Sequence, residues 1–345
     1  MLNIRVASKS RRQPRGVITG ISGGGKTRTM LEFLYACQLR REDFGLTGEH
    51  ILILDTEKDS ASLYSSGADP NTGLPNPTNH NLPDGPQFGF YGVDVIEETG
   101  SKFSLDWLSA RLKWLRNEGI NEYGICALGI DSLSHFWFGN GGALDEVELI
   151  AKARYKGDSY RAWGDITPKV NAVIDEIIAL PIPVMVSVRS KHAYERTETV
   201  VNGKKKTTIA RVGDAPVFRR DLLYEFDVGF VMTPQDTKGV LLSVDKTRYG
   251  GWDGVVQQDP DYKFFDQYLD WLCGTTGEVP KHQYYYADGE EIPHEKASAR
   301  RVFSMYRAAN NGAIPESKDT LMSWYENNHA QAAANVSVES AESSE

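Results

Sequence analysis

Short runs of consecutive apolar residues, each bounded by polar or glycine-rich segments, recur through residues 17–188 of this 345-residue chain. The clearest runs lie at residues 17–19, 51–55, 125–131 and 183–188. Uninterrupted apolar runs of this length are typical of parallel strands that are buried on both faces of a sheet. Two of the runs end in an acidic residue, Asp55 and Asp131.

Between these runs, apolar residues recur with the spacing of a helix, at residues 29–36, 105–115 and 170–179. Alternating strands and helices predict an α/β core with a mostly parallel central sheet. Residues 66–87 are rich in Gly, Pro, Asn and Asp and indicate a long surface loop, and residues 139–162 indicate a polar connection.

The pattern changes after residue 188. Residues 197–209 predict a hairpin that turns at Asn202-Gly203, a favoured two-residue turn. Residues 224–232 and 240–244 predict two further strands, so we expect an antiparallel extension of the sheet. Residues 297–309 have helical spacing.

These patterns divide the chain into four parts. We expect a basic N-terminal arm over residues 1–15, a core over 16–255, a small C-terminal appendage over 256–330, and a disordered acidic tail over 331–345.

The segment between the first strand and the first helix fits the phosphate-loop pattern G-x-x-x-x-G-K-[ST]. Glycines allow backbone N–H groups to converge on phosphate oxygens, and the following helix points its positive end at the same anion. The lysine can reach the β- and γ-phosphates of ATP, and the threonine hydroxyl can hold Mg²⁺. The predicted nucleotide-binding residues of this loop are Gly20, Ile21, Ser22, Gly23, Gly24, Gly25, Lys26 and Thr27.

Composition narrows the class of protein. A net charge of −9 argues against a globally basic nucleic-acid binder, although it leaves room for a local basic segment. The three cysteines show no C-x-x-C spacing, which disfavours a zinc site and suits a reducing compartment. No apolar run approaches 18 residues, so we expect a soluble cytoplasmic protein without membrane contact.

Two acidic residues follow the predicted strands and supply candidate chemistry. Asp131 stands where a carboxylate that organises Mg²⁺ belongs; the alternative is an ordinary acid at a strand end. Glu57 lies just beyond the carboxyl end of its strand, where ligands of parallel sheets bind. It can act as a general base toward the attacking water, or it can stabilise the start of the next helix.

Together, the phosphate loop, Asp55-Thr56-Glu57 and Ile130-Asp131-Ser132 resemble the RecA-type recombinase ATPases. The chain is similar in more detail to phage-encoded RecA-like ATPases, which are described as AAA-type phage nucleotide-binding proteins. That similarity covers roughly residues 14–250 and includes the segments 130–137, 188–191, 216–219, 224–227 and 246–248. It implies a RecA-like P-loop NTPase core that binds ATP and Mg²⁺.

The resemblance also implies roles for individual residues. Glu57 becomes the catalytic base, and Tyr64 falls where RecA places a tyrosine that stacks on adenine; the alternative for Tyr64 is a core aromatic. Ser187 replaces a γ-phosphate-sensing glutamine, which leaves Arg189 as a possible substitute. Lys246 and Arg248 match a pair that reaches the γ-phosphate of a neighbouring subunit, or they form a solvated pair at a strand end.

A concentrated basic segment follows the fourth predicted strand in this acidic protein. A flexible basic loop suits contact with the phosphate backbone of single-stranded DNA, and in RecA the matching position holds a DNA-binding loop. A solubilising hairpin is the alternative. The predicted DNA-binding residues are Arg189, Lys191, Lys204, Lys205, Lys206 and Arg211; a second basic group comprises Lys152, Arg154, Lys156 and Arg161.

Three functions fit these features. The first is an ATPase stimulated by single-stranded DNA, assembled as a homo-oligomeric ring or filament with ATP between subunits, whose acidic tail recruits a replication or recombination partner. The second is a P-loop kinase that phosphorylates a nucleotide or a modified DNA base. The third is a nucleotide-gated assembly protein that does not bind DNA.

Overall fold

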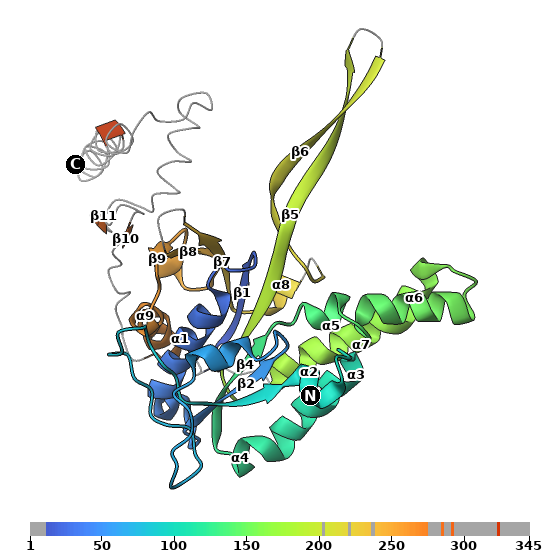
Figure 1. Ribbon diagram of the computed structural model, residues 1–345. Coiled ribbons are helices and arrows are strands. Elements are labelled where there is room, and N and C mark those ends of the chain that lie inside the picture. The colour runs from blue at the N-terminus through green and yellow to red at the C-terminus, as the bar shows by residue number, and fades with distance from the viewer. Residues whose placement is uncertain are drawn as a thin grey trace, which may run out of the picture.

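The computed structural model describes residues 12–201, 204–219, 222–235, 239–274, 284–285, 291–292 and 323–324. Its central sheet runs in the order β3-β2-β4-β5-β1-β7-β8-β9 (Figure 1). The parallel strands are β3 (Phe90–Asp94), β2 (His50–Asp55), β4 (Ile125–Asp131), β5 (Val184–Val201), β1 (Arg15–Gly20) and β7 (Val228–Pro234). The antiparallel strands β8 (Val240–Lys246) and β9 (Val256–Gln258) continue the sheet. The predicted fold class, α/β with a mostly parallel sheet and an antiparallel extension, is confirmed.

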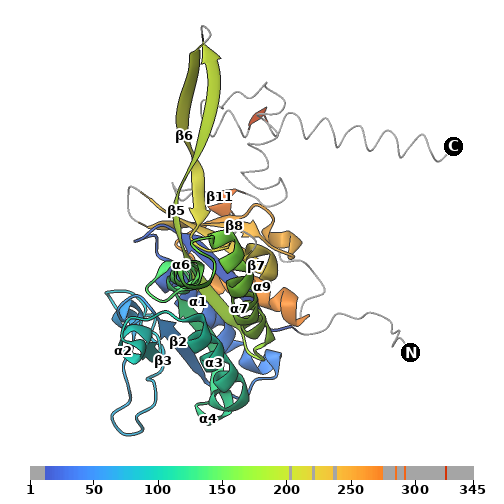
Figure 2. The ribbon, with the colours of Figure 1, turned by 90° about the vertical axis from the view of Figure 1, so that its right-hand side faces the viewer.

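Helices cover both faces of the sheet (Figure 2). Successive strand residues point to opposite faces, so Ile18 packs with α1 (Lys26–Leu39) and α9 (Tyr262–Cys273) on one side. Val17 packs on the other side with α3 (Leu105–Trp114) and α7 (Ser159–Ala179). Burial on both faces explains why the strands read as continuous apolar runs.

The remaining elements are short or lie outside the two layers. They are η1 (Arg41–Phe44), η2 (Ser60–Tyr64), α2 (Val95–Thr99), the π-helical η3 (Leu115–Gly119), α4 (Ile120–Glu122), α5 (His135–Phe138), α6 (Ala143–Arg154), β6 (Lys204–Pro216), α8 (Leu222–Glu225), η4 (Gly250–Trp252), β10 (Tyr284–Tyr285) and β11 (Glu291–Ile292).

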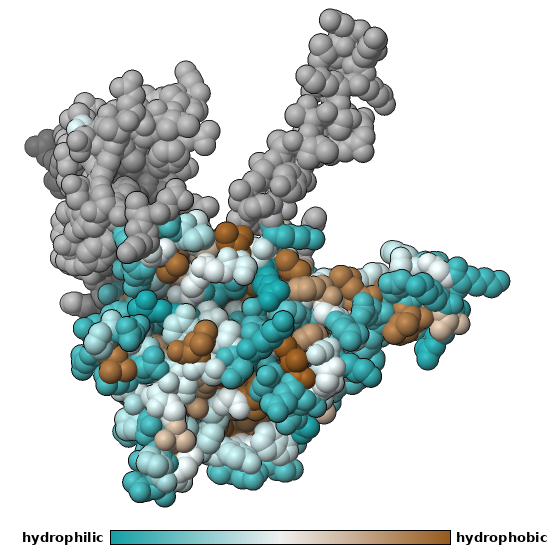
Figure 3. Space-filling model, in the orientation of Figure 1, coloured by the Kyte–Doolittle hydropathy of each residue, from teal (hydrophilic) through white to brown (hydrophobic). Residues whose placement is uncertain are grey.

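Residues 139–162 differ from the polar connection that we expected. They contain α6 and the start of α7, which form a protruding helical arm (Figure 1). Ala143, Val147 and Ala151 are buried at helical spacing, a sparse pattern that charged neighbours obscure in the sequence. Leu149 is 65% exposed and Tyr160 is 88% exposed, and apolar patches interrupt the hydrophilic surface of the arm (Figure 3).

The predicted hairpin is much longer than residues 197–209. Strand β5 leaves the central sheet and pairs with β6 from Ser190↔Pro216 to Val201↔Lys204, with an irregularity after Ala193. The two strands form a ribbon that extends away from the core (Figures 1 and 2). The predicted turn, Asn202-Gly203, lies outside the described residues.

Two further expectations need correction. Residues 222–225 form α8, so the strand predicted from residue 224 begins only at Val228. Strand β9 joins the central sheet and α9 buries Phe265 and Tyr268, so the packed core continues to Cys273, beyond the predicted boundary at 255. Residues 297–309 and the predicted acidic tail lie outside the described residues.

Arg15, which we assigned to the basic arm, is instead the first residue of β1 and is buried. Its Nε donates to the carbonyl of Ile178 at 3.2 Å and its Nη1 to the carbonyl of Ile182 at 2.7 Å. The guanidinium therefore satisfies carbonyls at and beyond the end of α7. Residues 1–11 of the predicted arm lie outside the described residues. Among the helices described, none combines the length and apolar character needed to cross a membrane.

Candidate functional site

The predicted phosphate loop connects β1 directly to α1, as the motif requires. Gly25 occupies the position before α1 with φ 79°, in the left-handed region that favours glycine. A Cβ at Gly25 would lie 2.9 Å from Cγ1 of Val240, and one at Gly20 would lie 2.8 Å from the carbonyl oxygen of Met232. Both glycines are thus required by backbone conformation or by close packing against the neighbouring strands.

Lys26 begins α1, and its side chain turns back over the loop. It is 8% exposed, and Nζ donates to the carbonyl of Ile21 at 2.8 Å. Burial lowers the pKa of Lys26, although the carboxylates of Asp131 and Glu57 act in the opposite direction. A poorly solvated ammonium at the positive end of a helix creates a strong local preference for an anion.

Asp131, at the end of β4, accepts hydrogen bonds from two neighbouring segments. The Thr27 hydroxyl donates to Oδ2 at 2.5 Å, and the Ser187 hydroxyl of β5 donates to Oδ1. Burial raises the pKa of Asp131 despite these two donors. Because β5 lies between β1 and β4 in the sheet, Ser187 fills the gap between the loop and Asp131.

Glu57, beyond the end of β2, meets Arg189 of β5. Arg189 Nε donates to Glu57 Oε1 at 2.8 Å. Burial alone would raise the pKa of Glu57, but the hydrogen bond and charge of Arg189 outweigh it and lower that pKa. Asp55 holds the turn by accepting from the N–H groups of Glu57 at 2.5 Å and Ala61 at 2.8 Å.

Thr56 and His135 contact each other next to Glu57 and the turn after Asp131. We predicted no role for either residue from the sequence. The Thr56 hydroxyl lies 2.7 Å from His135 Nδ1 and 2.7 Å from the backbone N–H of Ser132, which donates to it. Phe103 stacks on the His135 ring with centroids 4.9 Å apart. This network ties the segment that carries Glu57 to the turn after Asp131. Both residues belong to segments that resemble the RecA-type ATPases, and that resemblance was the only feature of the sequence that could have indicated a role for them.

The phosphate loop, the two acids Glu57 and Asp131, and Arg189 border one cavity of about 180 Å³. Glu57, Tyr64 and Asp131 therefore lie together with the loop, and Arg28 and Arg189 join them. The cavity is lined by Ser22, Gly23, Gly24, Gly25, Lys26, Thr27, Arg28, Glu57, Tyr64, Asp131 and Arg189. Gly20 and Ile21 do not line it; they lie at the junction of β1 and the loop.

Lys246 and Arg248 lie away from this cavity. Strand β8 starts at Val240, beside Gly25, and its end, Lys246, pairs with Gly229 near the start of β7, about 20 Å farther along. Lys246 Nζ donates to the carbonyls of Tyr224 at 2.7 Å and Phe226 at 2.6 Å.

Arg248 makes a more open contact than Lys246. Its Nη1 lies 3.6 Å from Oδ1 of Asp227, and its side chain is 56% exposed. Neither cation lies within reach of the phosphate loop of its own chain.

The predicted DNA-binding residues divide between the cavity and the ribbon. Arg189 faces Glu57 in the cavity, and Lys191, just beyond it, is exposed. Lys204, Lys205, Lys206 and Arg211 lie on β6 by its register with β5. Lys152, Arg154, Lys156 and Arg161 lie at the tip of the arm formed by α6 and α7, on a helical hairpin where we expected a loop.

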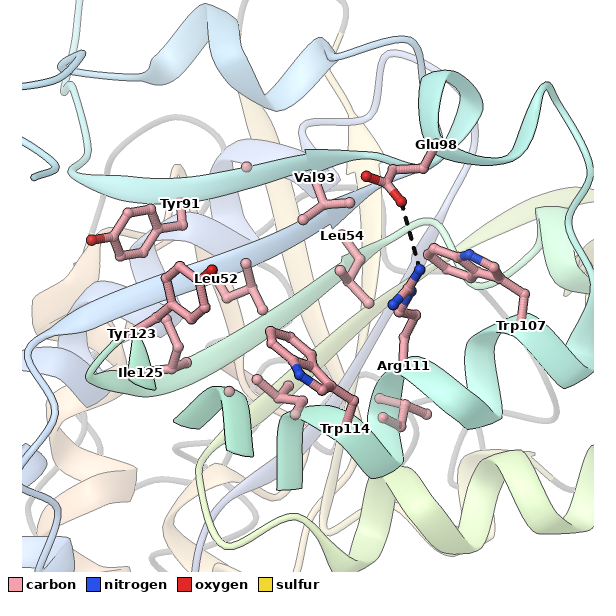
Figure 4. Close-up of a pocket in the computed structure, with 14 residues that line it drawn as sticks. Leu52, Leu54, Tyr91, Val93, Glu98, Trp107, Arg111, Trp114, Tyr123 and Ile125 are labelled. Carbon is pink, nitrogen blue, oxygen red and sulfur yellow. Dashed lines mark ion pairs between the residues drawn. The ribbon is translucent and has the colours of Figure 1, made fainter. Parts of the chain in front are cut away.

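A larger cavity of about 310 Å³ lies between the sheet and α3. Figure 4 shows Tyr91, Trp107, Trp114 and Tyr123 around it, with Arg111 paired to Glu98 at 3.8 Å. Size and apolar lining would favour this cavity for a small organic ligand. A triphosphate requires N–H donors and cations, so the smaller cavity is the better candidate for the predicted chemistry.

No protein-family model matches the chain, and no curated protein matches it either. Among solved structures, it is similar to the crystal structure of the RadB recombinase, with 13% identity and a TM-score of 0.36 over 72% of this chain and 87% of that chain. A likeness this distant gives no information on activity, so the functional case depends on the residues of the cavity.

Proposed function

We propose that this chain is a RecA-like ATPase that binds Mg²⁺ and ATP in the 180 Å³ cavity and acts on single-stranded DNA in phage recombination or replication. One observation carries the proposal. Lys26 and Thr27 of the phosphate loop, Asp131 at the end of β4 and Glu57 beyond β2 come from three segments of the chain and line the same cavity. Together they supply a phosphate ligand, oxygen donors for a metal and a candidate base.

Binding follows from the chemistry of the loop. The start of α1 and the Lys26 ammonium favour the β- and γ-phosphates. The Thr27 hydroxyl and the Asp131 carboxylate are the hard oxygen ligands that Mg²⁺ takes, and Mg²⁺ sites commonly add phosphate oxygens and water to one or two such groups. When bound, the ion would neutralise charge on the phosphates. Tyr64 borders the same cavity, which supports the proposal that its ring contacts the adenine base.

Hydrolysis requires an oriented water. The Glu57 carboxylate accepts a proton from the water molecule while the oxygen of that water forms a bond to the γ-phosphorus. The bond between that phosphorus and the β,γ-bridging oxygen breaks, which leaves ADP and phosphate. Lys26 and Arg189 stabilise the negative charge on the transferring group.

Assembly would complete the site. Lys246 and Arg248 lie far from their own loop, so any action of theirs on ATP would be on the ATP of another copy. Arg248 fits this role better than Lys246, because its side chain is half exposed whereas the Lys246 ammonium already binds two backbone carbonyls. ATP would then lie between subunits of a ring or filament, and a cation supplied in this way can contribute about 10³–10⁵ in rate.

The ribbon is the proposed DNA contact. Lys204, Lys205 and Lys206 are consecutive on β6, and exposed Lys191 lies on β5, so positive charge runs along an extended element. Such an element suits contact with phosphates without reading bases.

Phosphate release with and without single-stranded DNA, across a range of protein concentrations, tests this function. We expect release to rise with DNA and to rise more than linearly with protein concentration. Transfer of labelled phosphate to an added nucleotide or base would favour the kinase. A rate of phosphate release that is the same with and without DNA would favour the nucleotide-gated assembly protein.

A further inference from the structure

The cavity of about 310 Å³ between the sheet and α3 is separate from the proposed ATP site, and among the described residues the two cavities share no lining residue. Its buried walls are Leu52 and Leu54 of β2, Ile125 of β4, and Leu112 and Leu115 on the opposite side, each at most 8% exposed. Protein interiors are close-packed, so a space of this size is uncommon. A dry apolar cavity of about 150 Å³ is enough to bind benzene. The fold therefore has room for an apolar ligand of moderate size.

A π-helical turn forms one side of this cavity. Helix α3 continues directly into η3 at Leu115, and both Leu115 and Gly119 line the cavity. A Cβ at Gly119 would lie 2.7 Å from Cη2 of Trp114, so glycine is needed for the indole to pack against the turn. Turns of this kind inside helices occur frequently at functional sites. Here the turn sets the position of Trp114 in the cavity wall (Figure 4).

Four aromatic rings border the cavity, and contacts with one another or with the core hold them in place. Tyr123 meets Tyr91 at 5.8 Å between centroids and Trp114 at 6.0 Å, both edge to face. Trp107 stacks on buried Phe136 at 6.3 Å. The faces of aromatic rings carry partial negative charge and attract cations, and cages of such rings bind ammonium groups. The rings shown in Figure 4 therefore favour a positively charged ligand over an anion.

The charged groups at the cavity have the same preference. Glu98 and Arg111 lie 3.8 Å apart at one end, and each side chain is about half exposed. An adjoining hollow shares Glu98 and adds Asp94 and Glu97, so three acids and one base line the two spaces. The Arg111 guanidinium lies 5.6 Å from the centre of the Trp107 ring. This end of the cavity thus already holds one cation between a ring and a carboxylate.

We propose that this cavity is a second ligand site, which binds a small organic cation. The apolar body of the ligand fills the space between Leu54 and Trp114, and its ammonium lies near the Glu98 carboxylate. A separation of 3.8 Å between Glu98 and Arg111 is too long for a hydrogen bond, so the carboxylate keeps the capacity to accept one from the ligand. A volume of about 300 Å³ lies at the lower end of small-molecule sites, which excludes a large cofactor.

The test uses three fluorinated probes that share a phenylpropyl body and differ in charge, namely the ammonium, the alcohol and the carboxylate. Each is titrated with the full chain at neutral pH, and fluorine NMR measures its affinity. For the wild type, we expect the ammonium to bind at least about tenfold more tightly than the carboxylate, with the alcohol between them. A saturating non-hydrolysable ATP analogue with Mg²⁺ should leave the affinity of the ammonium unchanged, because the two cavities have different walls.

Two variants locate the probes in the cavity. Glu98→Gln removes the carboxylate, so it should weaken binding of the ammonium by at least about threefold and leave the affinity of the alcohol unchanged. Val93→Phe places a larger side chain in the cavity from β3, so it should weaken binding of all three probes by at least about fivefold. The matched controls are Glu42→Gln and Leu149→Phe, which make similar changes at exposed positions outside the cavity and should leave every affinity unchanged.

Each outcome decides the proposal. A wild type that binds none of the probes, or that binds the ammonium and the carboxylate equally, would overturn it. Displacement of the ammonium by the ATP analogue would overturn it as well, and so would an unchanged affinity for the ammonium in Glu98→Gln. If Val93→Phe fails to fold, the half-exposed Glu98 still provides the decisive variant. A chain that binds the ammonium but no ATP would refute the proposed function and leave this second site in place.

Discussion

The hydroxyl of Thr27 and the carboxylate of Asp131 lie 2.5 Å apart, although 104 residues separate them in the sequence. The sheet order produces this contact, because β1 and β4 end on either side of β5 at the same edge. Ser187 of β5 binds the other oxygen of the same carboxylate. The arrangement holds a buried carboxylate beside the phosphate loop, which is the relationship that the proposed ATP site requires.

Replacement of Lys26 by Ala should weaken ATP binding by at least about tenfold, because it removes the ammonium from the phosphate site. The melting temperature should stay within a few degrees of the wild-type value, since the ammonium is poorly solvated and bonds only to the loop carbonyl among the described groups. Titration with a fluorescent ATP analogue measures the first effect, and Lys102→Ala, an exposed site elsewhere, is the control. Unchanged affinity in Lys26→Ala would remove this lysine from the site.

Glu32 gives the fold a predictable dependence on pH. It lies on α1 at 1% exposure, and its Oε2 accepts from the N–H of Tyr262 at 3.1 Å. Burial raises the pKa of Glu32 to about 7, although Arg28 and the Tyr262 N–H act against the rise. A carboxyl whose pKa rises on folding stabilises the protein at low pH, and that contribution is lost as pH increases from about 4.5 to about 7.

Glu32→Gln should therefore stabilise the protein by about 3 kcal/mol at pH 8, with the difference shrinking toward zero below pH ~4.5. Urea unfolding at a series of pH values measures the free energy of unfolding. Glu42→Gln, an exposed acid just after the same helix, should leave the profile as it is. A difference between Glu32→Gln and the wild type that does not vary with pH would contradict this account of the carboxyl.

Arg248 and Lys246 should differ in their effects. Arg248→Ala should lower the rate of phosphate release per subunit at high protein concentration by at least about tenfold while ATP affinity stays the same, because the residue acts on another copy. Lys246→Ala should mainly lower stability, since it leaves the carbonyls of Tyr224 and Phe226 without this donor. If Arg248→Ala retains full activity at every concentration, the shared site is wrong.

The three consecutive lysines of β6 should determine the salt dependence of DNA binding. Simultaneous replacement of Lys204, Lys205 and Lys206 by Gln should reduce the slope of log affinity against log salt by about 2, at about 0.7 per lost phosphate contact. Lys263→Gln, an exposed lysine on α9, should leave the slope unchanged. Equal slopes for the triple variant and the wild type would move the DNA path to another surface.

The core of the fold was predictable because its strands are buried on both faces. The uninterrupted apolar runs at residues 51–55 and 125–131 predicted internal strands. The glycine pattern between β1 and α1 predicted the position of the phosphate loop. Helix α6 was missed because only Ala143, Val147 and Ala151 of its residues are fully buried, and charged residues dominate the rest of its sequence.

The candidate site was predictable as a set of residues but not as a set of contacts. Glu57 and Asp131 were found because acids that follow parallel strands gather at one edge of a sheet. The pairing of Arg189 with Glu57 depends on the side-chain direction at the point where β5 leaves the sheet, which no periodicity encodes. Arg189 was predicted both as a DNA contact and as a possible substitute for the γ-phosphate sensor, and its side chain borders the 180 Å³ cavity.

The most direct test of the account is a side-by-side measurement of ATP binding and phosphate release in the wild type and Glu57→Gln. We predict that the variant binds Mg²⁺ and ATP about as tightly as the wild type and releases phosphate at least about 100-fold more slowly, as loss of a general base requires. Equal rates of release from the two proteins, or a wild type that binds no ATP, would contradict it.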